Sequence, residues 1–132
     1  MVTTKVKIQF HDCDPAGILF FANIYKLAHN AYQEFLEQGL TWNYFEDGNV
    51  ALPIIKSTAE YHKPMKSGEV FTVKLLVSNL KDSSFELTYL FYDNASDLYA
   101  EVKTVHVSVN KITFEKIKLS ADLSQLLTAN YV

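Results

Sequence analysis

The sequence predicts a single α+β domain in which one long helix packs against an antiparallel sheet. The chain has 132 residues, of which 48% are hydrophobic and 14% aromatic, and this suits one ordinary domain with a full core. One stretch repeats its apolar side chains at helical spacing, whereas most of the later chain alternates with the period of a strand. The 4 glycines and 3 prolines are scattered, and no repeat, low-complexity tract or linker divides residues 1–132.

Residues 5–10 predict the first strand, because polar and apolar side chains alternate there. One face carries the apolar side chains Val6, Ile8 and Phe10. The next segment, residues 11–17, is dense in turn formers. Pro15 fixes its own φ angle and Gly17 permits a left-handed backbone, so we expect a tight turn before the next element.

The predicted helix covers about 15 residues after Asn23. Its apolar side chains follow one face of a helix and are Ile24, Leu27, Ala28, Ala31 and Phe35. Asn23 is the expected N-cap, and Gly39 is the expected C-terminal stop.

Two later runs, residues 71–77 and 85–91, alternate as strands, and residues 80–83 between them predict a hairpin connection. Both runs carry apolar side chains on both faces. A single helix covers only one face of a sheet, so we expect a second copy of the chain to cover further apolar surface.

The remaining elements are shorter or less regular. Residues 59–62 predict the end of a strand, residues 93–97 a second connection, and residues 99–110 a long strand. Ser120 is expected to cap a short C-terminal helix. This helix carries Leu123, Leu126 and Leu127.

Composition excludes several classes of protein. The 12 basic and 15 acidic residues give a net charge of −3 with no basic stripe, so we expect no binding to nucleic acid. No apolar run approaches the ~20 residues of a membrane span, and residues 1–5 show no apolar signal segment. Cys13 is the single cysteine and cannot form an internal disulfide. Together these features lead us to expect a cytoplasmic protein without membrane contact.

The most informative stretch for chemistry is residues 10–25, where Asp12 and Asp14 flank Cys13 on a turn just before a helix. A helix start offers unpaired N–H groups that suit an oxyanion. A carboxylate in front of such donors is a candidate nucleophile or general base. From the residues alone, the more common role of both aspartates is that of turn residues whose side chains bond local amides.

These residues also carry a resemblance. Residues 11–21 read His-Asp-Cys-Asp-Pro-Ala-Gly-Ile-Leu-Phe-Phe, and Asn23 follows. This resembles the signature of the 4-hydroxybenzoyl-CoA thioesterase family of hot-dog proteins, roughly Asp-(Thr/Cys)-Asp-x-x-Gly followed by two hydrophobic residues, an aromatic residue and an Asn. The resemblance implies a hot-dog fold, with a long central helix wrapped by a curved antiparallel sheet. It also implies dimers whose sheets join edge to edge, often paired into homotetramers.

The resemblance places the catalytic aspartate on Asp14 and the amide that polarises the thioester carbonyl on Phe21. It implies that Asp14 attacks the carbonyl or activates water. We place the substrate-binding residues at Pro15, Gly17, Ile18, His29, Lys63 and Lys81. The two lysines lie in or near predicted turns and could meet the phosphates of coenzyme A, or face solvent.

Two departures from the family pattern bear on the substrate. Phe20, Phe21 and Ala22 stand where many short-chain members carry a histidine, and this favours an aromatic acyl group. His29 stands where the family usually has an acidic residue, so it is expected to shape the acyl pocket. The alternative is that His29 faces water, because it lies outside the apolar stripe of the helix.

We therefore predict an acyl-CoA thioesterase that acts on an aromatic acyl group, hydroxybenzoyl-like or dihydroxynaphthoyl-like, or on a medium-chain one. The alternatives are hydrolysis of an acyl group on acyl carrier protein, and non-catalytic binding of an acyl thioester. Asp14 weighs against a pure binder. Cys13 has no histidine at a recognisable spacing, and the four histidines lack metal-ligand spacing, so we expect no metal and no cofactor.

Overall fold

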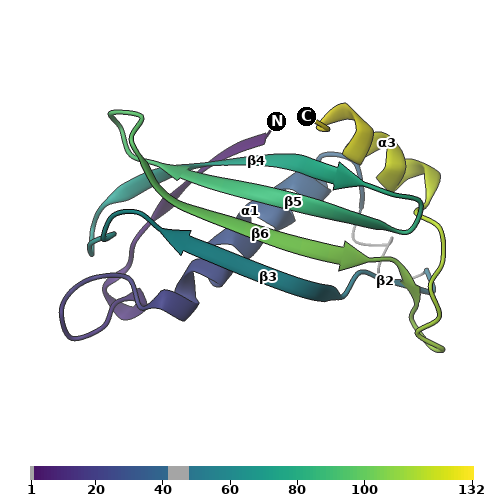
Figure 1. Cartoon of the computed structure of the whole chain (residues 1–132), viewed down its shortest axis with the longest axis horizontal. Helices are drawn as coiled ribbons and strands as arrows, with labels where there is room; N and C mark the ends of the chain where they lie inside the picture. The colour runs from purple at the N-terminus through teal and green to yellow at the C-terminus, as the bar shows by residue number, and fades with distance from the viewer. Residues whose placement is uncertain (1, 42–47) are drawn as a thin grey trace.

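A computed structural model describes residues 2–41 and 48–132. A long helix, α1 (Ile24–Glu37), lies along one side of a curved five-stranded antiparallel sheet (Figure 1). The strands of that sheet, in spatial order, are β1 (Val2–Lys7), β4 (Val70–Leu80), β5 (Ser84–Tyr92), β6 (Leu98–Val107) and β3 (Ile54–Tyr61). This confirms the α+β class and the long helix against an antiparallel sheet that the sequence predicts.

The outer strands β1 and β3 each pair with one neighbour only within the described part of the chain. β1 pairs with β4 from Val2 opposite Leu75 to Lys7 opposite Val70. β3 pairs with β6 along its whole length, with an irregularity at Ile55. The far edge of β3 is therefore open to a further strand.

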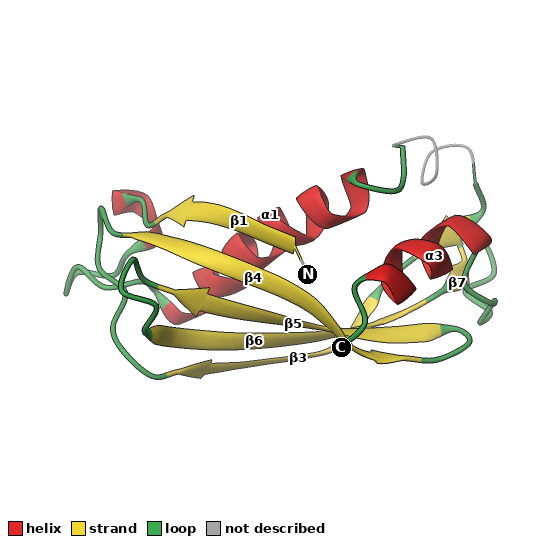
Figure 2. Cartoon of the chain, turned by 90° about the horizontal axis from the view of Figure 1, so that it is seen from above, coloured by secondary structure: helices red, strands yellow, loops and turns green. Residues whose placement is uncertain are grey.

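The core lies between α1 and the concave face of the sheet (Figure 2). The predicted stripe of the helix is buried, from Ile24 to Phe35. It packs on alternate side chains of the central strands, which include Phe71, Leu75, Phe85, Leu87, Phe91 and Val102. The side chains between them point to the other face of the sheet, because successive side chains of a strand alternate between the two faces.

The first strand is shorter than predicted. β1 ends at Lys7, and the chain then turns into a short 3₁₀ helix, η1 (Phe10–Asp12). Ile8 is fully buried as expected, but Phe10 is 88% exposed, so its predicted place on the buried face is wrong. Alternation stops applying where the strand ends, and this explains the error.

The prediction that a strand ends within residues 59–62 is confirmed, because β3 begins at Ile54 and ends at Tyr61. Most of its residues are exposed, because it is an edge strand. The connections at 80–83 and 93–97 lie between β4, β5 and β6 as predicted.

Two short strands, β2 (Val50–Ala51) and β7 (Val109–Asn110), pair beside the end of the sheet. The C-terminal helix α3 (Ala121–Ala129) follows, and Ser120 Oγ accepts a hydrogen bond from the Leu123 amide at 3.2 Å, which confirms the predicted cap. Neither helix in the described ranges has the length and apolar character needed to cross a membrane.

Candidate active site

Asp12 joins the turn after β1 to the start of α1. Its side chain is 1% exposed and accepts hydrogen bonds from the Gln9 amide at 3.0 Å and from Lys26 Nζ at 2.5 Å. Its backbone carbonyl accepts from the Phe20 amide and from Asn23 Nδ2, each at 2.9 Å. One buried residue thus binds the segment before the site and the helix after it.

This arrangement corrects the prediction for Asn23. The residue does stand at the N-cap of α1, but its side chain caps no helical amide and donates instead to Asp12. A second 3₁₀ turn, η2 (Phe21–Asn23), directly precedes α1 and leads into its first residue. Asn23 therefore holds the turn in place.

The hydrogen bonds from Lys26 and Gln9 keep Asp12 ionised. Burial by itself raises the pKa of a carboxyl, but the hydrogen bonds from Lys26 and Gln9 and the positive charge of Lys26 outweigh it. The pKa of Asp12 therefore lies below its ordinary value of 3.8, and the carboxylate stays ionised at neutral pH.

Asp14 is held by the turn that follows. Its Oδ1 accepts from the Ala16 amide at 2.9 Å, its carbonyl accepts from the Gly17 amide at 3.0 Å, and its own amide donates to the Ile18 carbonyl at 2.9 Å. Gly17 has φ +80°, a conformation that side chains with a Cβ rarely adopt. The turn fixes one carboxylate oxygen of Asp14 and leaves the other available.

The start of the helix supplies a free donor. Among the described residues, no acceptor is found for the Phe21 amide, as is usual at the first position of a helix. The Phe21 carbonyl accepts a hydrogen bond from the Tyr61 hydroxyl at the end of β3. Burial and the neighbouring Tyr25 raise the pKa of Tyr61, so this hydroxyl remains a donor.

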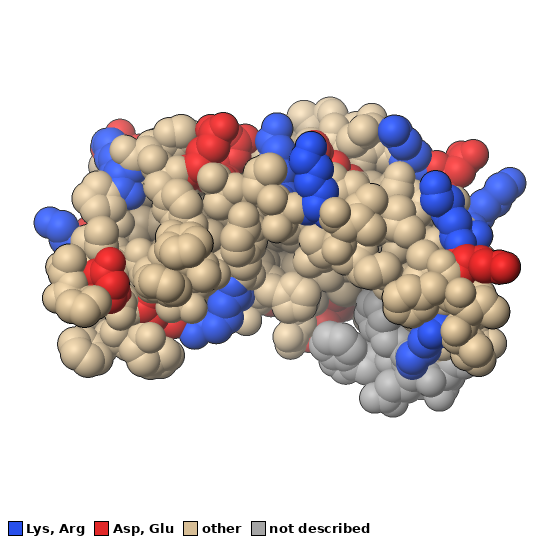
Figure 3. Space-filling model, turned by 60° about the horizontal axis from the view of Figure 1, so that its bottom comes forward, with Lys and Arg blue, Asp and Glu red and all other residues tan. Residues whose placement is uncertain are grey.

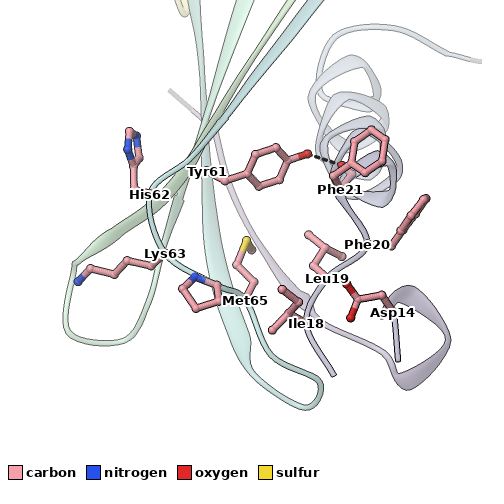
Figure 4. A pocket seen from close by; sticks show the side chains of 10 residues that line it. Asp14, Ile18, Leu19, Phe20, Phe21, Tyr61, His62, Lys63 and Met65 are labelled. Carbon is pink, nitrogen blue, oxygen red and sulfur yellow. Dashed lines mark hydrogen bonds between the residues drawn. The ribbon is translucent and has the colours of Figure 1, made fainter. Parts of the chain in front are cut away.

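These elements enclose a cavity of about 400 Å³. Asp14 lies at one side of it with its carboxylate turned toward Ile18 and Leu19, and Tyr61 reaches across to Phe21 (Figure 4). The cavity is lined by Asp14, Ile18, Leu19, Phe20, Phe21, Tyr61, His62, Lys63, Pro64 and Met65. Most of its wall is apolar, with one carboxylate and one ammonium group at its margin.

The structure brings Asp14, Phe21, Ile18 and Lys63 to this cavity, and their roles in a shared site stay predictions. Pro15 and Gly17 do not line it and instead shape the turn of Asp14. Sequence reasoning missed Tyr61 and Met65, which come from the distant end of β3 and the loop after it.

Lys81 lies away from the cavity, in the hairpin between β4 and β5. Lys63 Nζ is 3.6 Å from Asp97 Oδ2 and lies over the ring of Tyr99, so its charge is partly engaged. Cys13 is half-buried, and its Sγ is 3.5 Å from the Gln9 carbonyl.

A second cavity, also of about 400 Å³, follows the first along the gap between α1 and β3. His29 lies here, away from the first cavity and exposed at the side of α1. The lining is Tyr25, Lys26, Ala28, His29, Asn30, Ile54, Ser57, Tyr89 and Thr104. The first cavity lies at η2, just before α1, and at the end of β3, whereas the second lies between α1 and earlier residues of the same edge strand.

One cluster among the described residues has donor atoms close enough to hold a metal ion. Glu60, His62 and Glu101 place one donor atom each within 4.8 Å of one another. Glu60 and Glu101 are cross-strand partners on the sheet face that points away from α1. Sequence reasoning missed this cluster because pairing of β3 with β6 creates it. Its His62 also lines the cavity with Asp14.

The fold and the site together define a class. The model of the thioesterase-like superfamily matches residues 8–127, and the chain belongs to this family. The resemblance to hot-dog thioesterases is thereby confirmed, as are the fold and the prediction of a thioester hydrolase.

Particular relatives are similar over nearly the whole chain. A 1,4-dihydroxy-2-naphthoyl-CoA hydrolase from Rippkaea orientalis is 35% identical over 124 residues, which cover 91% of this chain and 90% of the relative. One from Gloeothece citriformis is 32% identical, with 85% and 81% covered.

Solved structures agree in fold. A 1,4-dihydroxy-2-naphthoyl-CoA thioesterase from Synechocystis superposes with a TM-score of 0.89 at 22% identity, over 96% of this chain and 94% of that one. A Staphylococcus aureus protein in complex with CoA gives 0.90 at 16% identity, over 98% and 82%.

We predict that Asp12→Asn lowers the free energy of unfolding by about 1–3 kcal/mol at pH 7, because the charge-assisted hydrogen bond from Lys26 is lost. The pKa of Asp12 is depressed in the folded state, so its contribution is present above 3.8 and is lost as the pH falls through the folded-state value. Urea unfolding at pH 7 and at pH 3 measures this, with the exposed Asp82→Asn as control. A deficit of equal size at both pH values would contradict the ion-pair explanation.

Proposed function

We propose that this thioester hydrolase cleaves an aromatic acyl-CoA, with Asp14 and the Phe21 amide acting on the thioester carbonyl. One observation carries the proposal: within the described chain, a carboxylate with a free oxygen and a helix-start amide without an acceptor border the same apolar cavity. A carbonyl group placed between them would have its oxygen at the amide and its carbon at the carboxylate. That is the geometry that acyl transfer requires.

Two routes use these groups. In the first, an Asp14 oxygen attacks the carbonyl carbon, the C–S bond breaks, coenzyme A leaves as the thiolate, and water hydrolyses the resulting anhydride. In the second, Asp14 takes a proton from a water molecule whose oxygen attacks the same carbon. In both routes the Phe21 amide stabilises negative charge on the carbonyl oxygen, and the products are the carboxylic acid and coenzyme A.

The lining of the first cavity and the names of the relatives support an aromatic acyl group. Ile18, Leu19, Phe20 and Met65 make the first cavity apolar, and no histidine stands in η2 at the helix start. The relatives in Rippkaea orientalis and Gloeothece citriformis are named for the hydrolysis of a dihydroxynaphthoyl thioester. Lys63 at the margin of the cavity suits a phosphate of coenzyme A.

We further propose that two copies join along β3. Its outer edge is unpaired within the described chain, and it carries exposed apolar side chains, with Ile54 44%, Ile55 63% and Tyr61 44% exposed. The face that carries this edge is largely uncharged, with basic and acidic groups interspersed (Figure 3). An exposed apolar edge strand has unpaired backbone N–H and C=O groups that can pair with another strand. Two β3 strands related by a twofold axis would pair these groups and cover the apolar side chains.

Asp14→Asn keeps the shape of the side chain and removes the nucleophile or base. We expect kcat to fall by at least ~10³-fold while the protein stays folded. A thiol-trapping assay with an aromatic acyl-CoA measures the released coenzyme A, and circular dichroism reports the fold. Asp82→Asn serves as the control. A variant at position 14 that keeps most of the wild-type turnover would rule out the mechanism.

Cys13→Ala tests the other nucleophile in the turn. The thiol lies against the Gln9 carbonyl and does not line the cavity, so we expect kcat within about tenfold of wild type, or at most ~1.4 kcal/mol in the barrier. The same assay measures it. A folded Cys13→Ala protein without turnover would indicate that the Cys13 thiol is the nucleophile.

Light scattering at micromolar concentration is expected to report at least twice the chain mass of 15.1 kDa. Ile55→Asp places a charge on the open edge, so it should shift the protein toward the monomer and lower its activity. Val70→Asp, at an exposed valine on β4, is the matched control and should leave the mass unchanged. A fully active wild-type monomer would refute the edge-paired assembly.

A further inference from the structure

A chain of three buried polar side chains borders the second cavity and has no part in the chemistry proposed above. The Tyr89 hydroxyl is 3.1 Å from Thr104 Oγ1, and Thr104 Oγ1 is 2.8 Å from His106 Nε2. Tyr89 and His106 are at most 1% exposed, and Thr104 is 4% exposed. Tyr89 and Thr104 nevertheless line the cavity.

Aromatic side chains hold the His106 end of this hydrogen-bonded row in place. The His106 ring stacks on Phe85 at 4.8 Å with planes 5° apart, and Tyr32 of α1 packs on it at 4.7 Å. This packing fixes the direction of Thr104 and Tyr89. A rigid pair of hydroxyl groups in an apolar wall is the arrangement by which a pocket orients a ligand.

The three hydrogen-bonded side chains are neutral at pH 7. Burial and the nearby His29 together lower the pKa of His106 to about 4, although a hydrogen bond with the Leu52 backbone acts in the opposite direction. Burial also raises the pKa of Tyr89 well above its ordinary value, although the hydrogen bond with Thr104 opposes this. Tyr89, Thr104 and His106 thus offer neutral hydrogen-bonding groups to the cavity, whereas its charged neighbour Lys26 is paired with Asp12.

Such a chain suits a hydroxyl group. If its protons run toward His106, the oxygen lone pairs of Tyr89 and Thr104 face the ligand as acceptors. If they run the other way, the Tyr89 hydroxyl is a donor. A phenolic hydroxyl both donates and accepts, so it pairs with either arrangement.

The second cavity is also placed correctly for the acyl group. Tyr25 lies one turn beyond Phe21 and His29 two turns beyond it, or roughly 6 and 12 Å along the helix axis. Tyr61, which bonds the Phe21 carbonyl at the first cavity, belongs to the same edge strand as Ile54 and Ser57, which line the second. A ring attached to a carbonyl at Phe21 would therefore extend toward the second cavity.

We infer that the second cavity receives the ring of the acyl group, and that Tyr89 and Thr104, held by His106, recognise a hydroxyl group on that ring. The inference rests on the proposed function, because the ring is that of the proposed aromatic thioester. It adds a specificity element that is remote from Asp14 and the Phe21 amide.

The test compares 1,4-dihydroxy-2-naphthoyl-CoA with 2-naphthoyl-CoA, which lacks both hydroxyl groups. In Thr104→Val and Tyr89→Phe, the ratio of kcat/KM for the hydroxylated over the plain substrate should fall by roughly tenfold, the scale of one lost hydrogen bond. Thr104→Ser keeps the hydroxyl group and should restore the ratio. Thr88→Val is the control, since Thr88 is buried on the opposite face of the sheet and bonds Ser78 Oγ at 2.8 Å.

A ratio that stays at its wild-type value in both Thr104→Val and Tyr89→Phe would overturn the inference, because a merely structural role affects both substrates equally. Calorimetric titration of the wild type and Thr104→Val with 1,4-dihydroxy-2-naphthoate and 2-naphthoate provides a second measurement. The two proposals can then fail separately. Absence of hydrolysis by the wild type in the kinetic assay refutes the proposed function. Equal affinity of the wild type for the two acids in the titration refutes the recognition of the hydroxyl group.

Discussion

The site depends on one constraint, which is that Asp12 is buried, ionised and bonded on both sides of the turn. Its carboxylate needs the Gln9 amide and Lys26 because a buried charge without partners is costly. Its carbonyl takes the Phe20 amide and the Asn23 side chain. The segment between residues 12 and 23 therefore has little freedom, and Asp14 and Phe21 are both inside it.

The rest of the architecture follows from where that segment is fixed. Because Phe20 is tied to Asp12, the Phe21 amide begins a helix with no carbonyl before it to accept its hydrogen bond. The curved sheet brings the end of β3 to the same place, where Tyr61 bonds the Phe21 carbonyl. The second cavity lies between α1 and β3 farther along the helix, where we propose that the ring of the acyl group binds.

The sequence predicted what local patterns encode. The apolar stripe of the helix, the turn that carries Asp14 and the cap at Ser120 were all correct, because each depends on residues close together in the chain. What it missed joins distant segments: Tyr61 meets Phe21 across 40 residues, and Tyr89 meets Thr104 across 15. The placement of Phe10 failed for a related reason, since alternation cannot show where a strand stops. The roles of the site residues were predicted from the family resemblance and remain predictions.

The most direct measurement of the central claim is a crystal structure of the protein with a ketone analogue of an aromatic acyl-CoA, in which a CH₂ group separates the carbonyl from the sulfur and blocks cleavage. Our account predicts that the carbonyl oxygen lies about 3 Å from the Phe21 nitrogen, with the carbonyl carbon facing Asp14 and the ring directed toward Tyr89 and Thr104. A carbonyl bound away from the Phe21 amide, with Asp14 out of reach of its carbon, would contradict it.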